Sequence, residues 1–345
     1  MNEAAQHPAV DFTLYPPIGG DDWRYGFSTA RARCLESQLL SRGFMQDIAS
    51  AAGFEEALEM LSSSEYAMPK GTKNFRDIES LLIQRRTQAR DTFSELTIDE
   101  ELIEPLIVRT DFANMRLALR RKLTEKPLGI DYSDGGSVPA EEFEAIFEEE
   151  NYSPLPEHMQ DAIERAVLAY YQNKDVRQID HALDAAHYEY KLRRANELKN
   201  VFLLELFRMQ IDLINIRTML RLKFTDSLDR NVFLDGGYVE IAMLKHCLDV
   251  GYEAIAALFF ATPYYDVLES GVSYLAAKQS FVKLDANCDN HMNGFLGTTF
   301  MITAGPQPVF AYLLLKEGEI RNIRLILTGK MNSLDTQLIL DRIGD

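Results

Sequence analysis

The chain has 345 residues, enough to bury more than one hydrophobic core, and its 46% hydrophobic and 26% charged residues are typical of a globular protein. Its formal net charge of −17 argues against nucleic acid as a partner, because a phosphate backbone attracts basic surfaces. Three widely spaced cysteines without a CxxC pair favour a reducing compartment and argue against a disulfide framework: Cys34, Cys247 and Cys288.

Residues 1–23 are polar and acidic and contain Pro16-Pro17 and Gly19-Gly20, which predicts a flexible tail rather than a signal peptide. Beyond them, apolar residues recur at spacings of three and four, and no run shows the sustained alternation of a β-strand. The chain is therefore expected to be all-α. The clearest predicted helices are, in chain order, Arg31–Leu40, Phe54–Leu61, Ile78–Leu96, Glu141–Phe147, Asp161–Tyr171, Ile179–Leu222 (expected to be two helices), Val239–Leu248 and Val309–Leu327.

Turn-forming residues separate the predicted helices, at Met68–Gly71, Ser133–Ser137, Ser153–Pro156 and Asp235–Gly237. Residues 290–315 contain no Asp, Glu, Lys or Arg, so they need a test as a membrane span. A spanning helix requires about 20 predominantly apolar residues. Glycines, threonines and prolines interrupt this stretch, and we interpret it as a buried turn that leads into a core helix.

One motif occurs three times. Asn114, Asn215 and Asn322 each have an acid three residues before them, an apolar residue and an Arg directly after them, a Leu at the fifth place and a Lys at the eighth. The three Asn residues lie 101 and 107 positions apart (215 − 114 and 322 − 215). The first two copies also carry Asp-Gly-Gly at the same offset. The repeated polar residues are Asp111, Asn114, Arg116 and Lys122; Asp212, Asn215, Arg217 and Lys223; and Glu319, Asn322, Arg324 and Lys330.

The spacing of the motif predicts three similar helical domains, because about 100 residues suffice for a small domain with its own core. A weaker similarity links Gly53-Phe54…Tyr66 to Gly251-Tyr252…Tyr264. With boundaries directly after each repeated helix, we expect a flexible tail at 1–23 and helical repeat domains at 24–126, 127–227 and 228–345. Three such domains favour a ring-like or funnel-like body with a central concavity.

On a helical projection, the residues at −2, +1 and +5 from each Asn form one apolar stripe. They are Phe112, Met115 and Leu119; Leu213, Ile216 and Leu220; and Ile320, Ile323 and Leu327. The acid and the Arg flank this stripe on opposite sides, and Asn points toward a second layer. Residues at +4 are apolar as well (Ala118, Met219, Ile326), so most of the helix is expected to be buried. Its polar side chains must then find hydrogen-bond partners.

Two interpretations of these polar residues remain open. In the first, Asn114, Asn215 and Asn322, with the three Arg residues, only lock the packing between helices. In the second, Arg116, Arg217 and Arg324, with Arg120, Arg121 and Arg221, present basic patches around a shared cavity and bind an acidic partner element. The second interpretation is worth considering because three basic clusters occur at equivalent places on a chain with a net charge of −17.

The sequence contains no set of residues that indicates catalysis. Leu327–Met331 supplies a Gly-Lys pair without the rest of a phosphate-binding loop, and GxGxxG and HExxH are missing. His181, Asp184 and His187 resemble half of a carboxylate-bridged di-metal site, but no second copy follows. Cys288 and His291 also lack a matching pair of zinc ligands. We therefore expect no catalytic, cofactor or metal site and no direct nucleotide binding.

Two segments resemble a known family. Residues 25–41, beginning Tyr25-Gly-Phe-Ser-Thr, resemble the N-terminal helix of the C subunit of archaeal and bacterial V-type (A-type) rotary ATPases, the counterpart of the eukaryotic d subunit. Residues 305–327, which include the third copy of the repeated motif, resemble that family's most characteristic segment. Together with the triplication, the resemblance covers about residues 24–343.

The resemblance implies a non-catalytic subunit. Members of this family are all-helical, with three similar domains around a pseudo-threefold axis in a funnel. They lie peripherally on the cytoplasmic side of the membrane, on the proteolipid rotor ring, and receive the foot of the central stalk, so that torque passes between ATP turnover and ion transport. The resemblance leaves open whether H⁺ or Na⁺ is transported and whether ATP is mainly made or hydrolysed.

Two alternatives stay open. The chain could be a free-standing helical scaffold or adaptor, in which case no rotary ATPase subunits would co-purify with it. It could also be a helical metalloenzyme that uses Asp184 and His187, which a metal analysis would test.

Overall fold

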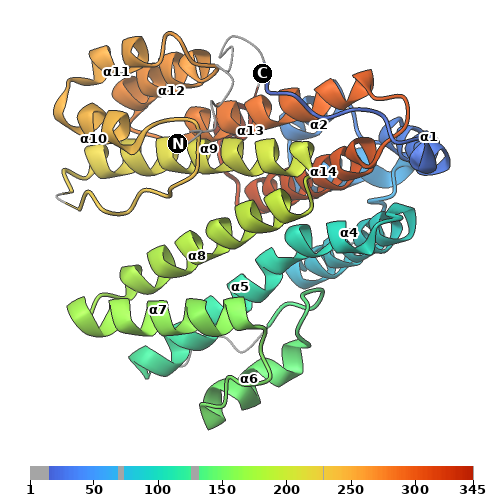
Figure 1. Cartoon of the computed structure of the whole chain (residues 1–345). Helices are drawn as coiled ribbons and strands as arrows, with labels where there is room; N and C mark the ends of the chain where they lie inside the picture. Colours follow the sequence, from blue (N-terminus) through green and yellow to red (C-terminus); the bar gives the residue numbers. More distant parts are fainter. Residues whose placement is uncertain (1–14, 69–73, 126–131, 228, 345) are drawn as a thin grey trace. The chain divides into compact units, whose positions relative to one another are not determined.

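The computed structural model describes residues 15–68, 74–125, 132–227 and 229–344, and helices joined by short turns make up most of them (Figure 1). No β-strand occurs in these ranges, so the predicted all-α class is confirmed. Residues 1–14 of the expected tail, the turn expected at 69–71 and the domain boundaries expected at 126 and 228 lie outside the described residues.

The α-helices follow one another as α1 (Gly26–Glu36), α2 (Arg42–Ser50), α3 (Phe54–Met60), α4 (Phe75–Leu96), α5 (Glu104–Thr124), α6 (Ala140–Glu149), α7 (Glu157–Asn173), α8 (Val176–Glu197), α9 (Val201–Phe224), α10 (Ile241–Asp249), α11 (Tyr252–Leu258), α12 (Tyr265–Lys278), α13 (Val282–Gly297), α14 (Pro306–Met331) and α15 (Thr336–Ile343). Short 3-10 turns lie at Trp23–Tyr25 (η1), Leu61–Ser63 (η2), Glu100–Leu102 (η3) and Thr298–Met301 (η4).

Most predicted helices are present with small changes at their ends. The segment predicted as Arg31–Leu40 instead ends at Glu36, because Ser41 starts a new helix by accepting a hydrogen bond from the Phe44 backbone N–H at 3.2 Å. The long segment predicted to contain two helices does so. Asn200 caps the second of them, α9, by accepting from the Leu203 N–H at 2.9 Å.

The chain divides into two compact units, one formed by residues 1–98 and 249–345 and the other by residues 99–248. The three-domain division expected from the repeat therefore stays a prediction. The unit of residues 99–248 has α5 packed against α6, α7 and α8, and α8 packed against both α7 and α9 (Figure 1). Phe112 and Met115 of α5, Phe143 of α6, Met159 of α7 and Leu183 of α8 are buried together in its core.

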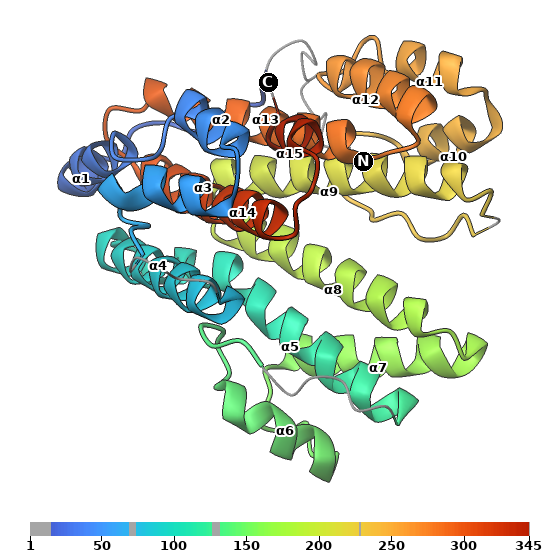
Figure 2. The same ribbon diagram turned by 180° about the vertical axis from the view of Figure 1, so that it is seen from behind.

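In the other unit, α14 is the central helix. It packs against α1, α2, α3, α4 and α15, and Figure 2 shows it beside α4. Ile320, Ile323 and Leu327 of α14 share one core with Ile48 of α2 and Ile78 of α4. Segments that are far apart in the sequence therefore build this core. In the same unit, α12 packs against α11 and α13.

The described part of the expected tail, residues 15–23, is bound to the turn before α14. Asp21 accepts hydrogen bonds from the Thr303 and Ala304 N–H groups at 2.9 and 3.4 Å, and the Asp22 N–H donates to the Ala304 oxygen at 2.7 Å. Gln307 donates to the backbone oxygens of Ile18 and Gly20. The flexible tail expected at 1–23 stays a prediction, and its described portion has these specific partners on α14 and the turn before it.

The uncharged stretch 290–315 contains the end of α13, η4, a short turn and the beginning of α14. Pro306 lies in the first turn of α14, where its missing N–H has no helical partner to lose. The interpretation as a turn that leads into a core helix is confirmed, since α14 is buried along much of its length. Among the described residues, no helix is long and apolar enough to cross a membrane.

Candidate functional site

The three copies of the repeated motif lie on α5, α9 and α14. The apolar stripe predicted for them is buried in each copy, with side chains that are at most 3% exposed. The residues at +4, Ala118, Met219 and Ile326, are buried too. The helical projection therefore identified the core face of all three helices correctly.

Asn114 and Asn215 bind the backbone of the segment that follows their helix in the same way. The Asn114 side chain donates to the Ser133 oxygen and accepts from the Ser133 N–H, both at 2.9 Å. Asn215 makes the same two bonds with Leu234, both at 2.8 Å. Both partners lie 19 residues after the Asn. An amide side chain that pairs with both backbone groups of one residue anchors the segment on its helix.

The acids of these two copies anchor the next residues of the same segments. Asp111 accepts from the Ser137 and Val138 N–H groups at 2.9 and 3.2 Å, and Asp212 accepts from the Tyr238 and Val239 N–H groups at 3.1 and 3.0 Å. Burial raises the pKa of the Asp111 carboxyl, while these hydrogen bonds act in the opposite direction. The acid thus fixes the backbone just before α6 or α10 begins.

This arrangement explains the repeated Asp-Gly-Gly. Gly135 and Gly236, the first glycines of the two pairs, have φ of 90° and 93°, a backbone region that favours glycine. A Cβ at the second glycines, Gly136 and Gly237, would lie 2.1 Å from the Asp111 and Asp212 carboxylate oxygens. Both glycines are required for the acid to reach the backbone.

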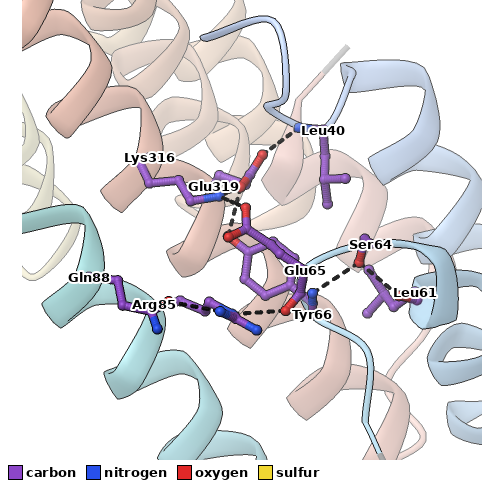
Figure 3. Close-up of polar contacts among 9 residues, drawn as sticks. All are labelled: Leu40, Leu61, Ser64, Glu65, Tyr66, Arg85, Gln88, Lys316 and Glu319. Carbon is purple, nitrogen blue, oxygen red and sulfur yellow. Dashed lines mark hydrogen bonds and ion pairs between the residues drawn. The ribbon is translucent and has the colours of Figure 1, made fainter. Parts of the chain in front are cut away.

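In the third copy, the N-terminal part of the chain takes the place of a following segment. Glu319 accepts from the Leu40 N–H, two residues before α2 begins, and from the Tyr66 hydroxyl at 2.6 Å (Figure 3). Lys316, buried one turn earlier on α14, pairs with both Glu319 and Glu65 (Figure 3). Burial, followed by the charge of Glu319, raises the pKa of the Tyr66 hydroxyl. The other two copies have Val108 and Met209 at the position of Lys316.

The lysine at the eighth place of each copy donates a hydrogen bond to a backbone oxygen. Lys122 donates to the Phe147 oxygen near the end of α6, Lys223 to the Leu248 oxygen near the end of α10, and Lys330 to the Ala51 oxygen just after α2. Their distances are 2.6, 3.2 and 2.6 Å. In each copy, then, the acid holds the backbone before a short helix and the lysine holds its end. We call this arrangement of acid, lysine and short helix the clamp.

Asn322 is the exception among the three Asn residues. It is half-buried, and its side chain contacts the Met45 sulfur at 3.9 Å instead of pairing with a backbone group. The third copy therefore has the clamp of Glu319 and Lys330 without the additional pairing of an Asn with a backbone group.

Two of the arginines that follow the Asn residues, Arg116 and Arg324, pair inside their own units. Arg116 pairs with Asp184, and its Nε lies 3.3 Å from an Asp180 oxygen, both on α8. Arg324 pairs with Glu79 of α4 at 2.7 Å. The Arg116 and Arg324 side chains are 32% and 35% exposed, and Arg217 has a partner as well. Their contacts support the packing interpretation, and binding of these arginines to an acidic partner stays a prediction.

Three of the residues considered for metal binding make other contacts. Asp184 pairs with Arg116, whereas His187 packs its ring on Phe112 with centroids 4.9 Å apart. Burial lowers the pKa of His187 well below its usual range. The His291 ring contacts the rings of Tyr15 and Tyr264, with centroids 5.2 and 5.1 Å apart. In the portion of the chain that the structure describes, no group of three His, Cys, Asp or Glu residues could hold a metal ion.

The role of the N-terminal segment in the third copy was not predicted. The available signal was the similarity between Gly53…Tyr66 and Gly251…Tyr264. Gly53 and Gly251 precede α3 and α11, the helices that follow the clamped helices α2 and α10, and both tyrosines are fully buried. By this similarity, residues 42–66 correspond to the segment that follows a repeated helix. In the third copy that helix is α14, although residues 42–66 precede it in the sequence.

Comparison with known proteins covers most of the chain. Residues 28–342 match the model of the family described as ATP synthase (C/AC39) subunit. The chain is 23% identical to the C subunit of the V-type sodium ATPase of Enterococcus hirae, over 90% of this chain and 95% of that protein. It is 20% identical to the C subunit of the A-type ATP synthase of Methanococcoides burtonii, over 94% and 95%. The C subunit of a V-type ATP synthase of Thermus thermophilus is 24% identical, over 74% and 80%.

Proposed function

The chain belongs to the ATP synthase (C/AC39) subunit family, and we propose that it is the non-catalytic socket of a V/A-type rotary ATPase. In this role it links the central rotor shaft to the membrane proteolipid ring and transmits torque between ATP turnover and ion transport. It has no active site of its own and lies peripherally on the cytoplasmic side of the membrane as part of the complex.

The observation that carries this proposal is the extent of the family match. It includes residues 28–342, so all three copies of the repeated helix and the segments that their clamps hold fall within it. Two relatives, both C subunits of a V-type or an A-type enzyme by name, are matched over 95% of their own length. A protein that had kept only one part of such a subunit would not match over this extent.

Exposed apolar side chains support a role in assembly. Trp23 lies on η1 and Phe27 in the first turn of α1, and Phe300 and Met301 lie on η4; they are 72%, 80%, 74% and 83% exposed. Arg33 of α1 stacks on the Phe300 ring at 4.4 Å, which joins the two segments. We call these four apolar residues the apolar patch. Exposed apolar side chains on these two joined segments support a surface for another protein, here a subunit of the same complex.

Affinity purification of the tagged chain from native membranes tests the proposal. Other subunits of a rotary ATPase should be recovered in stoichiometric amounts, and the chain expressed alone should neither bind Mg-ATP with micromolar affinity in calorimetry nor carry stoichiometric metal. Recovery of the chain without any rotary ATPase subunit would instead favour a free-standing scaffold.

A further inference from the structure

The internal repeat allows one copy of the structure to be compared with another. In the third copy, Arg324 of α14 pairs with Glu79 of α4, and in the first, Arg116 of α5 lies against Asp180 of α8. Glu79 and Asp180 are 101 residues apart (180 − 79), the same as the interval between the first two Asn residues. Helices α4 and α8 therefore hold equivalent places beside α14 and α5.

One equivalent position differs in charge. In the third copy, Glu317 lies five residues before Asn322 and pairs with Arg90 of α4 at 3.1 Å. The corresponding residues of the first copy are Arg109, five before Asn114, and Lys191, which is 101 after Arg90. An acid and a base in the third copy are thus replaced by two bases in the first, and the carboxylate is missing.

Lys191 has no substitute carboxylate among the described residues. Its side chain is 5% exposed and donates to the Gln210 amide oxygen of α9 at 2.8 Å. The rings of Phe207 and Tyr188 lie 4.1 and 4.8 Å from its nitrogen. Burial, and then the charge of Arg109, lowers the pKa of the Lys191 ammonium to about 7. A buried ammonium with only an amide and two rings for partners is costly.

Arg109, Tyr188 and His187 lie in the surroundings of the Lys191 ammonium. Arg109 is exposed, and no ion pair joins it to a described residue. Tyr188 is half-buried. Burial raises the pKa of its hydroxyl to about 12, while the charges of Arg109 and Arg217 lower that pKa. His187, one turn before Lys191, has a buried Nε2 without a hydrogen-bond partner. The nearby acid, Asp184, forms its ion pair with Arg116.

We propose that Arg109, Tyr188 and Lys191 form a receptor for one carboxylate of a protein partner, at the place where α5 and α9 meet α8. The partner's Asp or Glu supplies the charge that Glu317 supplies internally in the third copy. Because the inference rests on the proposed function, the partner is an acidic segment of the rotor shaft. An ion pair formed on binding, rather than within the chain itself, contributes to affinity and selects the partner.

The substitution Arg109→Glu tests this directly, because it builds into the first copy the pair that Glu317 and Arg90 form in the third. The free variant should be more stable, with a melting temperature about 2 °C higher, since Lys191 gains an internal partner. Its affinity for purified rotor-shaft subunits should fall at least tenfold. Arg76→Glu, the same charge change on an exposed face of α4, should leave the affinity for the shaft subunits unchanged.

Nuclear magnetic resonance of ¹³C-labelled lysine gives an independent readout. The Lys191 signal, assigned with Lys191→Arg, should titrate near pH 7 in the free chain and well above it in the shaft complex and in Arg109→Glu.

Three outcomes would overturn the inference. If the wild-type chain binds no shaft subunit, both the proposed function and the inference fail. If it binds and Arg109→Glu binds equally well, only the inference fails. If phosphatidylglycerol vesicles, and not the shaft, raise the pKa of Lys191, the site recognises a lipid headgroup instead.

Discussion

Lys330 in the last turn of α14 donates a hydrogen bond to the Ala51 backbone oxygen at 2.6 Å, across 279 residues of chain. The same lysine reaches the Thr336 hydroxyl at 2.9 Å. In the first two copies the equivalent lysine holds a segment 25 residues further along the chain. The third clamp therefore holds a segment that precedes its helix in the sequence instead of one that follows it.

We expect Lys330→Met to lower the free energy of unfolding by about 2 kcal/mol, since it leaves the buried Ala51 oxygen without a donor. Lys122→Met is the matched control, because Lys122 is more exposed and water can replace it at the Phe147 oxygen. It should cost less than about 1 kcal/mol. Urea denaturation of both variants measures the two losses in the free energy of unfolding. Equal losses would contradict the expectation that Lys330 contributes more to stability than Lys122.

The three Asn residues should differ in their contribution to stability. Asn215→Leu removes two hydrogen bonds to Leu234 and leaves both backbone groups buried and unpaired, so we expect a loss of about 3 kcal/mol. Asn322→Leu should change stability by less than about 1 kcal/mol, because Asn322 contacts only a sulfur atom at 3.9 Å. Thermal and urea unfolding would show the contrast. A large loss for Asn322→Leu would contradict the small contribution expected of the Asn322 side chain.

Of the three cysteines, Cys34 is exposed and Cys247 and Cys288 are buried. Burial also raises the pKa of the Cys247 thiol to about 11, which keeps it out of the reactive thiolate form. A maleimide reagent at neutral pH should therefore label one site in the native protein and three after denaturation. Mass spectrometry of the labelled peptides identifies the site, and Cys34→Ser serves as the control. Rapid native labelling of Cys247 would contradict the packing of α10.

Stability should fall as the pH is lowered from 6.5 toward 4. Burial lowers the pKa of His291 to about 4, against a usual value of 6.5, so the unfolded chain binds a proton in this window that the folded chain does not. The cost for this residue is roughly 2 kcal/mol at pH 5. The variant His291→Gln should show a flatter decline between pH 6.5 and 5, and the exposed His246→Gln should follow the wild type. An unchanged slope in His291→Gln would assign the pH dependence to other groups.

The apolar patch should matter for assembly and not for folding. Phe27→Ser and Met301→Ser remove exposed side chains, so the melting temperature should change by less than about 1 °C. Recovery of the other rotary ATPase subunits in affinity purification should fall at least tenfold. Leu168→Ser, which removes a 59% exposed side chain from α7, is the control and should retain full recovery.

Much of the local structure follows from the sequence, because the period of apolar residues determines which face of a helix can be buried. The stripes of α5, α9 and α14, and the requirement that Asp111, Asn114 and their counterparts find buried partners, were predictable for that reason. The Asp-Gly-Gly turns were recognisable too, since the motif occurs at one fixed offset from the Asn in the first two copies.

The tertiary structure alone decided how the third copy is completed and which charges pair. Glu319 meets Leu40 and Tyr66, and Lys330 meets Ala51, across 253 to 279 residues, and no periodic pattern reports a contact at such separation. Likewise, Arg109 and Lys191 look like ordinary surface bases in the sequence. Only the packing of α5, α8 and α9 places them together without a carboxylate, because the burial of a charge depends on which helices surround it and not on its neighbours along the chain.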